Sequence, residues 1–137
     1  MALVHHELCF GCGRTNLFGL LLELEASRPG ALTGRCFLKQ DHQGPERGTA
    51  HDGVISAAVS DAMALACGPG AMARELHVEL LGTAPVGTFL EIEAELAQGG
   101  EPSQPDAGEL IQAVATASAE GRLVARARGV YGLPEPG

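Results

Sequence analysis

The sequence predicts an α+β domain in which an antiparallel sheet of about six strands wraps around one long central helix. The helix is predicted because residues 54–66 carry Ala, Val, Ile, Leu and Met on nearly every side, which is typical of a helix at the centre of a domain. The strands are predicted because other apolar runs alternate with polar residues at a period of two. A sheet can hide such a helix only by curving around it, so both elements would share one core.

The predicted helix covers about residues 52–67 and lies between a start signal and a stop signal. At its start, Asp52 can cap the first free amides. At its end, Cys67-Gly68-Pro69-Gly70 supplies the glycine and the proline that end a helix. We therefore expect one uninterrupted helix between these limits.

Two hairpins are predicted near the ends of the chain. Before the helix, apolar runs at residues 19–25 and 32–38 flank the turn Ser27-Arg28-Pro29-Gly30, which indicates paired strands. In the last part of the chain, residues 110–118 and 123–131 flank a short polar turn in the same way. Each pair is expected to be antiparallel, because the connection between its strands is short.

The segment that follows the helix predicts a further hairpin. Residues 76–80 and 90–96 alternate between apolar and polar positions, and the turn at 84–87 lies between them. The next segment, residues 98–108, is polar and rich in Gly, Pro and acidic residues, so it is predicted to form a surface loop.

Length and composition indicate one domain and exclude several classes of protein. The 137 residues, of which 45% are hydrophobic, suffice for one core but not for two, so residues 1–137 are taken as a single domain. The formal net charge of -8 would repel a nucleic acid backbone. No apolar run approaches the ~18 residues of a membrane span, and residues 1–6 lack the basic start of a signal peptide. We therefore expect a cytoplasmic protein that binds neither nucleic acid nor membrane.

The predicted sheet is small, and its edges would remain open in a monomer. Open sheet edges carry unpaired backbone groups that can pair with another chain. Most soluble oligomers are symmetric assemblies of one chain. We therefore expect a homodimer joined through sheet edges, with a homotetramer built as a dimer of dimers as a further assembly.

Four cysteines require an explanation. Cys9-Phe10-Gly11-Cys12, with His5 and His6 close by, could supply four zinc ligands. However, structural zinc sites usually join two separated half-sites, and here the sequence shows a single cluster. We therefore predict a tight glycine-rich turn and no metal, and we expect Cys36 and Cys67, which lie among apolar residues, to be small buried hydrophobic side chains.

Polar residues on the predicted helix mark a candidate site. Steps of four residues align Asp52, Ser56 and Ser60 along one side, while Asp61 lies about 100° around the helix from Ser60. In one interpretation, these groups and the helix N-terminus line a pocket in which free amides hold a developing negative charge. In the other, they are an N-cap, two serines bonded to the helix backbone and an aspartate at a subunit interface. The spacing alone leaves both open.

Several short motifs follow one another along nearly the whole chain. They are Cys9-Phe10-Gly11-Cys12-Gly13 with Asn16 and Gly19-Leu20, then His42-Gln43-Gly44, His51-Asp52-Gly53, Ala84-Pro85-Val86-Gly87 and Gly121-Arg122-Leu123-Val124-Ala125. In order and spacing they resemble the hotdog-fold acyl-CoA thioesterases, specifically the branch similar to the phenylacetate-degradation thioesterases. The resemblance implies a hotdog fold and hydrolysis of an acyl-CoA thioester. Coenzyme A would enter as part of the substrate, and no other cofactor is implied.

The resemblance also implies where the chemistry takes place. In such enzymes, a backbone amide just after a loop histidine polarises the thioester carbonyl at the N-terminus of the central helix. The matching histidine is His51, and the amide would be that of Asp52 or Gly53. A helix carboxylate acts as nucleophile or activates water, and a loop Gln or Asn, here Gln43, orients the reacting groups. The active site is shared between two subunits, in agreement with the expected dimer.

The chain departs from the family pattern at the catalytic position itself. Counting from Gly53, the position of the usual carboxylate is occupied by Ser60, and Asp61 follows one residue later. Asp52 stands in the place of the first glycine of the family's loop motif. There are therefore three hypotheses about which residues, if any, carry out catalysis.

In the first hypothesis, Asp61 is the base or the nucleophile. In the second, Ser60 is the nucleophile or holds the attacking water, with His51 or His77 as its partner. In the third, the chain binds an acyl-CoA or another apolar ligand without turning it over, because the Asp52 carboxylate would compete with an oxyanion for the helix amides. Thioester hydrolysis is favoured over ligand binding alone, and other hotdog chemistry, such as dehydration, is the remaining alternative.

Overall fold

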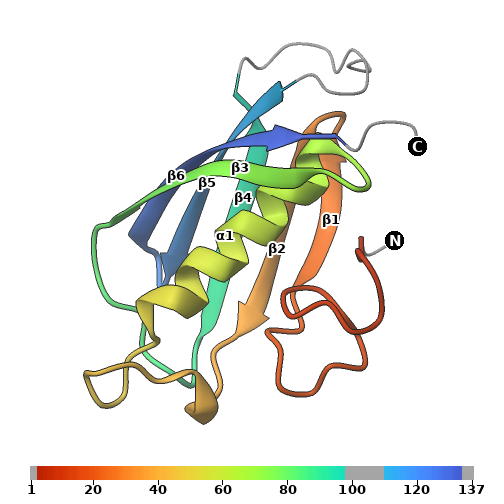
Figure 1. Cartoon of the computed structure of the whole chain (residues 1–137). Helices are drawn as coiled ribbons and strands as arrows, with labels where there is room; N and C mark the ends of the chain where they lie inside the picture. Colours follow the sequence, from red (N-terminus) through yellow and green to blue (C-terminus); the bar gives the residue numbers. More distant parts are fainter. Residues whose placement is uncertain (1–2, 98–109, 134–137) are drawn as a thin grey trace.

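Helix α1 (Asp52–Cys67) lies against the concave face of a six-stranded antiparallel sheet (Figure 1). The computed structural model describes residues 3–97 and 110–133, so the predicted surface loop at 98–108 falls outside the described residues. This arrangement confirms the predicted fold class and the limits of the predicted helix. The other elements are β1 (Glu23–Arg28), β2 (Ala31–Phe37), η1 (Gln40–His42), β3 (Met72–Leu80), β4 (Phe89–Leu96), β5 (Leu110–Ala119) and β6 (Arg122–Gly132).

The strands follow the order β1-β2-β4-β5-β6-β3 across the sheet. The predicted hairpins β1–β2 and β5–β6 are confirmed. The predicted hairpin between residues 76–80 and 90–96 is wrong, because β3 pairs with β6 while β4 lies between β2 and β5. The turn at 84–87 does not return the chain onto β3. Instead it is bound to the loop before α1, through bonds from the Ala50 amide to the Ala84 carbonyl and from the Val86 amide to the Gly48 carbonyl.

The core lies between α1 and the inner face of the sheet. Helix residues such as Ile55, Val59 and Met63 are almost completely buried there. The fully buried residues of β5 are all alanines, and their small size lets the helix backbone approach the sheet. These alanines are Ala113, Ala115, Ala117 and Ala119.

The residue that caps the start of α1 differs from the prediction, although the helix begins where it was predicted. The N-cap is His51, whose Nδ1 accepts a 2.8 Å hydrogen bond from the Gly53 amide, and Asp52 is the first helical residue. The predicted cap at Asp52 is therefore wrong by one position, because an imidazole nitrogen can accept the bond that a carboxylate oxygen usually accepts. At the other end, Gly68 has a φ of 129° and its amide bonds to the carbonyl of Ala64, as the predicted glycine stop requires.

The two edges of the sheet differ in chemistry. The β1 edge carries charged side chains and is partly covered by the N-terminal segment, residues 3–22, whose Leu3 amide donates to the Leu24 carbonyl. The β3 edge exposes the apolar side chains of Met72, Leu76 and Leu80 between charged ones, namely Arg74, Glu75 and Glu79. In the parts of the chain that the structure describes, no helix combines the length and the apolar character needed to cross a membrane.

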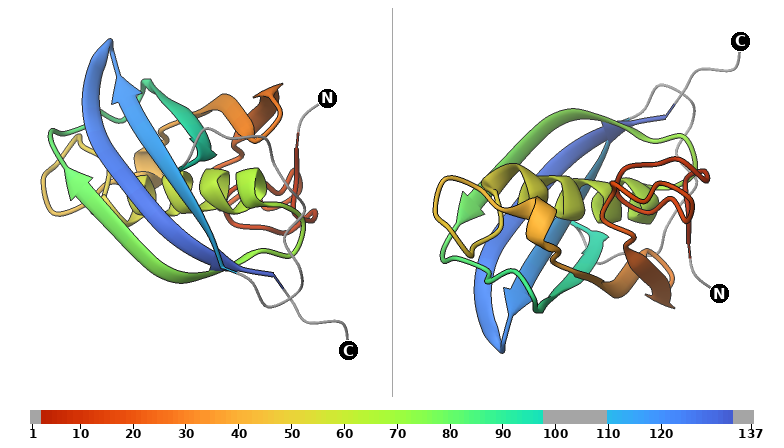
Figure 2. Two further views of the ribbon diagram at one scale, coloured as in Figure 1. Left: turned by 90° about the horizontal axis from the view of Figure 1, so that it is seen from above. Right: turned by 90° about the horizontal axis from the view of Figure 1, so that it is seen from below.

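The N-terminal segment lies beside α1 and covers part of the helix that the sheet leaves open (Figure 2). Its turns are fixed by backbone bonds, among them those from the Leu20 amide to the Phe10 carbonyl and from the Leu22 amide to the Gly11 carbonyl. Residues 19–22, which were predicted to begin a strand, are thus bonded to Phe10 and Gly11 within this segment. Strand β1 begins only at Glu23. The segment therefore acts as a third layer over the helix.

Candidate functional site

The loop that leads into α1 is held by a short network of backbone bonds. The amide of His51 donates to the carbonyl of His42 at 2.8 Å, and Gln43 forms an isolated antiparallel bridge with Ala50. The side chain of Gln43 is engaged within this loop, because its Nε2 donates to the Gln40 carbonyl and its Oε1 accepts from the Gly48 amide at 2.6 Å. Gln43 thus lies beside the start of the helix, where it shapes the loop.

The N-terminus of α1 is open to solvent. His51, Asp52 and Gly53 are all exposed, whereas every helix residue beyond them is buried or half-buried. The amide of Gly53 is already bound to the His51 ring, which leaves the amide of Asp52 as the candidate donor to a ligand. The positive end of the helix dipole and this amide could together hold a carbonyl oxygen that gains negative charge. The exposed Asp52 carboxylate lies at the same end.

Ser60 lies where the helix meets the end of β6. Its Oγ is 3.3 Å from the hydroxyl of Tyr131, and that hydroxyl donates a 3.0 Å hydrogen bond to the Ser60 carbonyl. Burial raises the pKa of Tyr131, although the bond with Ser60 opposes the shift, so the phenol stays protonated and remains a donor. Tyr131 was not among the predicted site residues, because an aromatic residue in a strand resembles an ordinary core residue.

The histidines proposed as partners of Ser60 lie elsewhere in this subunit. His51 caps the helix with its Nδ1. His77 lies on β3 next to Val78, which packs against the core. Because successive side chains of a strand point to opposite faces, His77 faces away from the helix. The structure therefore does not bring either imidazole to Ser60 within one chain.

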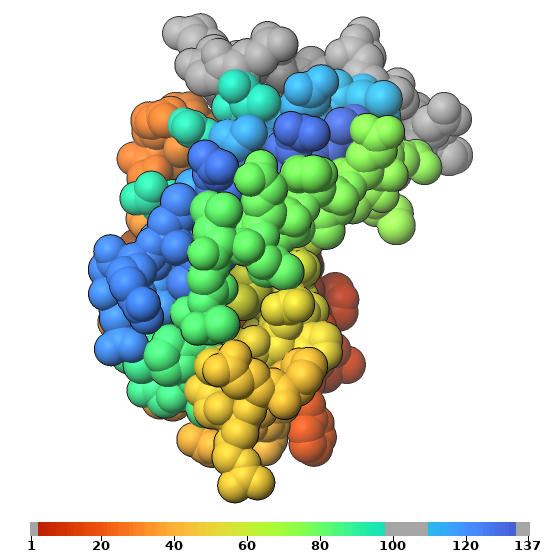
Figure 3. All heavy atoms as spheres, turned by 90° about the vertical axis from the view of Figure 1, so that its left-hand side faces the viewer, coloured from red at the N-terminus to blue at the C-terminus, as the bar shows by residue number. Residues whose placement is uncertain are grey.

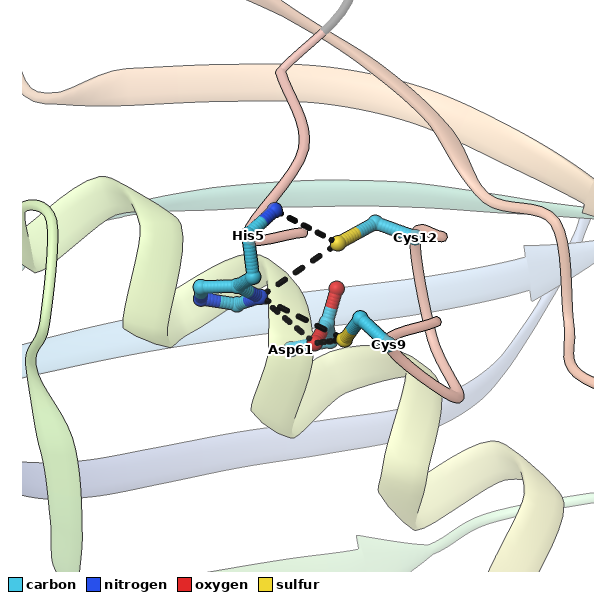
Figure 4. A group of neighbouring side chains, drawn as sticks. All are labelled: His5, Cys9, Cys12 and Asp61. Atoms are coloured by element: carbon cyan, nitrogen blue, oxygen red, sulfur yellow. Dashed lines mark hydrogen bonds and ion pairs between the residues drawn. The ribbon is translucent and has the colours of Figure 1, made fainter. Parts of the chain in front are cut away.

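Asp61 points into the N-terminal segment, where it meets three side chains that can bind metals (Figure 4). Its Oδ1 is 3.1 Å from Nδ1 of His5 and accepts a 3.3 Å hydrogen bond from the thiol of Cys9. Nδ1 of His5 is also 3.3 Å from Sγ of Cys12, and the His5 amide donates to the same sulfur at 3.1 Å. We call His5, Cys9, Cys12 and Asp61 the Cys–His–Asp cluster.

The ionisable groups of the Cys–His–Asp cluster influence one another strongly. The hydrogen bond with Asp61 raises the pKa of His5 to about 9, against the opposing effect of burial. Burial disfavours ionisation of Asp61, but the hydrogen bond and positive charge of His5 outweigh it and lower the pKa of the carboxyl. Burial raises the pKa of the Cys12 thiol to about 12. Without a metal, the cluster therefore contains an ion pair and a neutral Cys12 thiol.

The Asp61 carboxylate is enclosed by its own chain. Its side chain is 11% exposed, and its Oδ2 is buried without a hydrogen-bond partner among the residues that the structure describes. Cys9, Cys12 and His5 form a recognisable group in the sequence, but their contact with Asp61 was not predicted. No local signal could have made that connection, because Asp61 follows Cys9 by 52 positions.

The same fold occurs in solved structures of thioesterase superfamily proteins. No protein family model and no curated protein matches the sequence. A thioesterase superfamily protein superimposes with a TM-score of 0.71 at 20% identity, over 87% of this chain and 60% of the other. Thioesterase superfamily member 2 from zebrafish superimposes with a TM-score of 0.70 at 18% identity, over 87% of both chains. The chain has the hotdog fold.

A third structure with the hotdog fold corresponds to the branch that the motifs suggested. It is a phenylacetic acid degradation-related protein from Ralstonia eutropha JMP134, with a TM-score of 0.70 at 20% identity over 83% of this chain and 86% of the other. At such identities the likeness establishes the fold, while activity depends on the residues of the site itself. The resemblance found in the sequence is thus confirmed at the level of the hotdog fold.

Proposed function

We propose that this protein is a thioesterase-like hydrolase that cleaves an acyl-CoA thioester at the N-terminus of α1. The observation that supports this proposal most is the exposed start of an otherwise buried helix, in a fold shared with thioesterase superfamily proteins. The amide of Asp52 would polarise the thioester carbonyl, since the Gly53 amide is bound to His51. Water would then attack the carbonyl carbon and the C–S bond would break, which yields a carboxylate and the thiol of coenzyme A.

In this proposal Ser60 holds the attacking water. Ser60 lies eight residues, or about 12 Å, along the helix beyond Asp52, too far to act on a carbonyl held by the Asp52 amide of its own chain. The water it holds would therefore serve the thioester bound at the helix start of a second subunit. The Ser60 hydroxyl is paired with the Tyr131 hydroxyl at 3.3 Å. A serine without an oriented base is a poor nucleophile, so positioning of water suits Ser60 better than covalent attack. Asp61 is the weaker candidate because its carboxylate is bound by His5 and Cys9 and is largely enclosed.

A second copy of the chain would complete the site. β3 is an edge strand that presents Met72, Leu76 and Leu80 to solvent among charged side chains, and the open backbone groups of such an edge can pair with another strand. Figure 3 shows that β3 (green) reaches the surface next to the first residues of α1 (yellow). Pairing of two β3 strands would bring the second subunit close to both helix starts, which supports a homodimer and leaves a dimer of dimers as a larger assembly.

Ser60→Ala is expected to lower kcat for acyl-CoA hydrolysis by about tenfold or more, because it removes a hydrogen bond to the attacking water. The assay would follow thiol release from short, medium and aromatic acyl-CoAs. Ser118→Ala is the matched control, since Ser118 is also a half-buried serine but lies on the outer face of β5, away from α1. Equal rates for the two variants, together with loss of hydrolysis in Asp61→Asn, would assign the catalytic role to Asp61 instead.

Ligand binding without turnover is the second candidate function. It is favoured by the enclosure of the Asp61 carboxylate and by the exposed Asp52 carboxylate at the helix start, where an oxyanion would have to form. Binding of a CoA thioester to the folded state would raise the melting temperature of the protein. Such a rise with no detectable thiol release across the panel would support this candidate and contradict hydrolysis.

Leu76→Glu is expected to turn the proposed dimer into a monomer, because burying an unpaired charge between two β3 strands would cost several kcal/mol. Equilibrium sedimentation would measure the mass of the assembly. Leu17→Glu is the control, since Leu17 is 73% exposed and belongs to the N-terminal segment. A wild-type protein that sediments as a monomer would contradict the proposed dimer.

A further inference from the structure

The Cys–His–Asp cluster joins two parts of the chain. His5, Cys9 and Cys12 belong to the N-terminal segment, and Asp61 belongs to α1. Figure 4 shows the four side chains converging on one small region between the segment and the helix. One possible ligand atom from each side chain lies within 4.8 Å of the other three. Structural zinc sites usually join two separated parts of a chain, and here Asp61 on α1 is the part that the local sequence did not show.

The distances within the cluster are close to those around a zinc ion. In a tetrahedral site with Zn–S distances of about 2.3 Å and Zn–N or Zn–O distances of about 2.0 Å, neighbouring ligand atoms lie about 3.3–3.8 Å apart. Here Nδ1 of His5 lies 3.1 Å from Oδ1 of Asp61, 3.3 Å from Sγ of Cys12 and 3.6 Å from Sγ of Cys9. Sγ of Cys9 lies 3.3 Å from the same carboxylate oxygen. Small side-chain shifts would give a tetrahedron.

Hydrogen bonds alone do not satisfy the cluster. Nδ1 of His5 carries at most one proton, yet it faces a carboxylate oxygen and two sulfur atoms. Oδ2 of Asp61 is buried and has no hydrogen-bond partner within residues 3–97 and 110–133, which is costly for a carboxylate oxygen. A cation at the centre would interact with all four side chains at once.

The donor set favours zinc over other common metals. Two thiolates select a soft or borderline metal, whereas Mg²⁺ and Ca²⁺ require oxygen ligands. The two thiols would lose their protons on binding, as thiolate ligands do. We propose that His5, Cys9, Cys12 and Asp61 bind one zinc ion that fastens the N-terminal segment to α1.

The proposed zinc site is structural. Four protein ligands fill a tetrahedral shell, so no position remains open for a catalytic water. The segment also fits closely around the ligands, since a Cβ added at Gly11 would lie 2.5 Å from Cγ of Asp61. With zinc bound, the Asp61 carboxylate would stay directed into the N-terminal segment and would not be free to act on a substrate. This inference does not depend on thioester hydrolysis, and its test does not use that activity.

The first measurement is the metal content of untagged protein purified under reducing conditions. Elemental analysis is expected to find close to one zinc ion per chain. Replacement of zinc by Co²⁺ is expected to produce the thiolate-to-cobalt charge-transfer absorption and the visible bands of tetrahedral cobalt. Reduced wild-type protein that binds less than about a tenth of an equivalent of either metal would overturn the proposal. Because this arm uses the wild-type protein, it does not depend on the folding of any variant.

Variants then test the ligands one by one. Each ligand variant is expected to weaken zinc binding at least tenfold, measured by competition with a chromophoric chelator; the variants are His5→Ala, Cys9→Ser, Cys12→Ser and Asp61→Asn. His6→Ala and Cys36→Ala are the matched controls, because His6 is exposed next to His5 and Cys36 is a cysteine in the core. Both controls should bind zinc as the wild type does. If they lost zinc to the same extent as the ligand variants, the assignment of the site would be wrong.

Discussion

Leu90→Ala is expected to lower the free energy of unfolding by about 2–5 kcal/mol, the range typical of truncating a fully buried leucine. Leu90 is completely buried on β4, a central strand that packs against α1. Truncation removes the transfer free energy of the lost methyl groups and leaves a cavity that a dense core fills only in part. Urea unfolding, followed by circular dichroism, would measure the change as a shift of the midpoint.

Leu17→Ala is the matched control for this prediction. Leu17 is the same residue type but is 73% exposed, so its truncation should change the free energy of unfolding by no more than about 0.5 kcal/mol. The two variants lose the same atoms, and they differ only in whether the leucine side chain is buried or exposed in the wild-type protein. Equal stabilities of Leu90→Ala and Leu17→Ala would show that β4 does not lie under the helix as described.

Gly13→Ala is expected to destabilise the protein by about 3 kcal/mol, because overpacking against backbone atoms cannot be relieved by a change of rotamer. A Cβ at Gly13 would lie 2.5 Å from the amide nitrogen and 2.6 Å from the carbonyl oxygen of Cys9, and it would also meet the carbonyl of Glu7. The turn that positions Cys9 would have to open. Hydrogen exchange should accordingly become faster at the Leu20 and Leu22 amides, which are bonded to the same segment.

Gly82→Ala provides the control for the glycine substitution. A Cβ at Gly82 would find its nearest neighbours at 3.8 Å and 3.9 Å, which is ordinary van der Waals contact. This variant should keep wild-type stability and the wild-type exchange pattern of the N-terminal segment. If both alanine variants behaved alike, the turn around Gly13 would not be as tightly packed as the structure indicates.

Local patterns predicted the elements whose partners are close in the sequence. The predicted helix limits at Asp52 and Cys67 agree with the structure. Both limits depend on neighbouring residues, because a long apolar run favours a helix and the following Gly-Pro-Gly ends it. The hairpins β1–β2 and β5–β6 were predicted for the same reason, since a short turn leaves the chain few alternatives to antiparallel pairing.

The misassigned hairpin shows where local patterns fail. Residues 76–80 and 90–96 have the alternation of strands, and both are strands in the structure. Their pairing, however, depends on contacts between the 84–87 turn and the loop before α1, and on the insertion of β4 between β2 and β5. Alternation identifies which face of a strand is buried but not which neighbour it has.

The candidate site was predicted in part. The motif around His51 identified the start of the helix and its exposed amides, because the order of motifs along the chain resembles that of a known family. Whether Ser60 or Asp61 faces a substrate was left open by spacing alone. In the structure the two residues diverge, since Ser60 meets Tyr131 while Asp61 turns into the N-terminal segment.

The fold class, the limits of the helix and the presence of two thiols, an imidazole and a carboxylate could all be read from the amino-acid sequence. That these four groups meet could not, because Asp61 contacts Cys9 across 52 positions of chain. The strand order and the different surroundings of Ser60 and Asp61 likewise became visible only in the folded chain. The period of a helix or strand depends on neighbouring residues, whereas contacts between distant residues form only when the whole core packs.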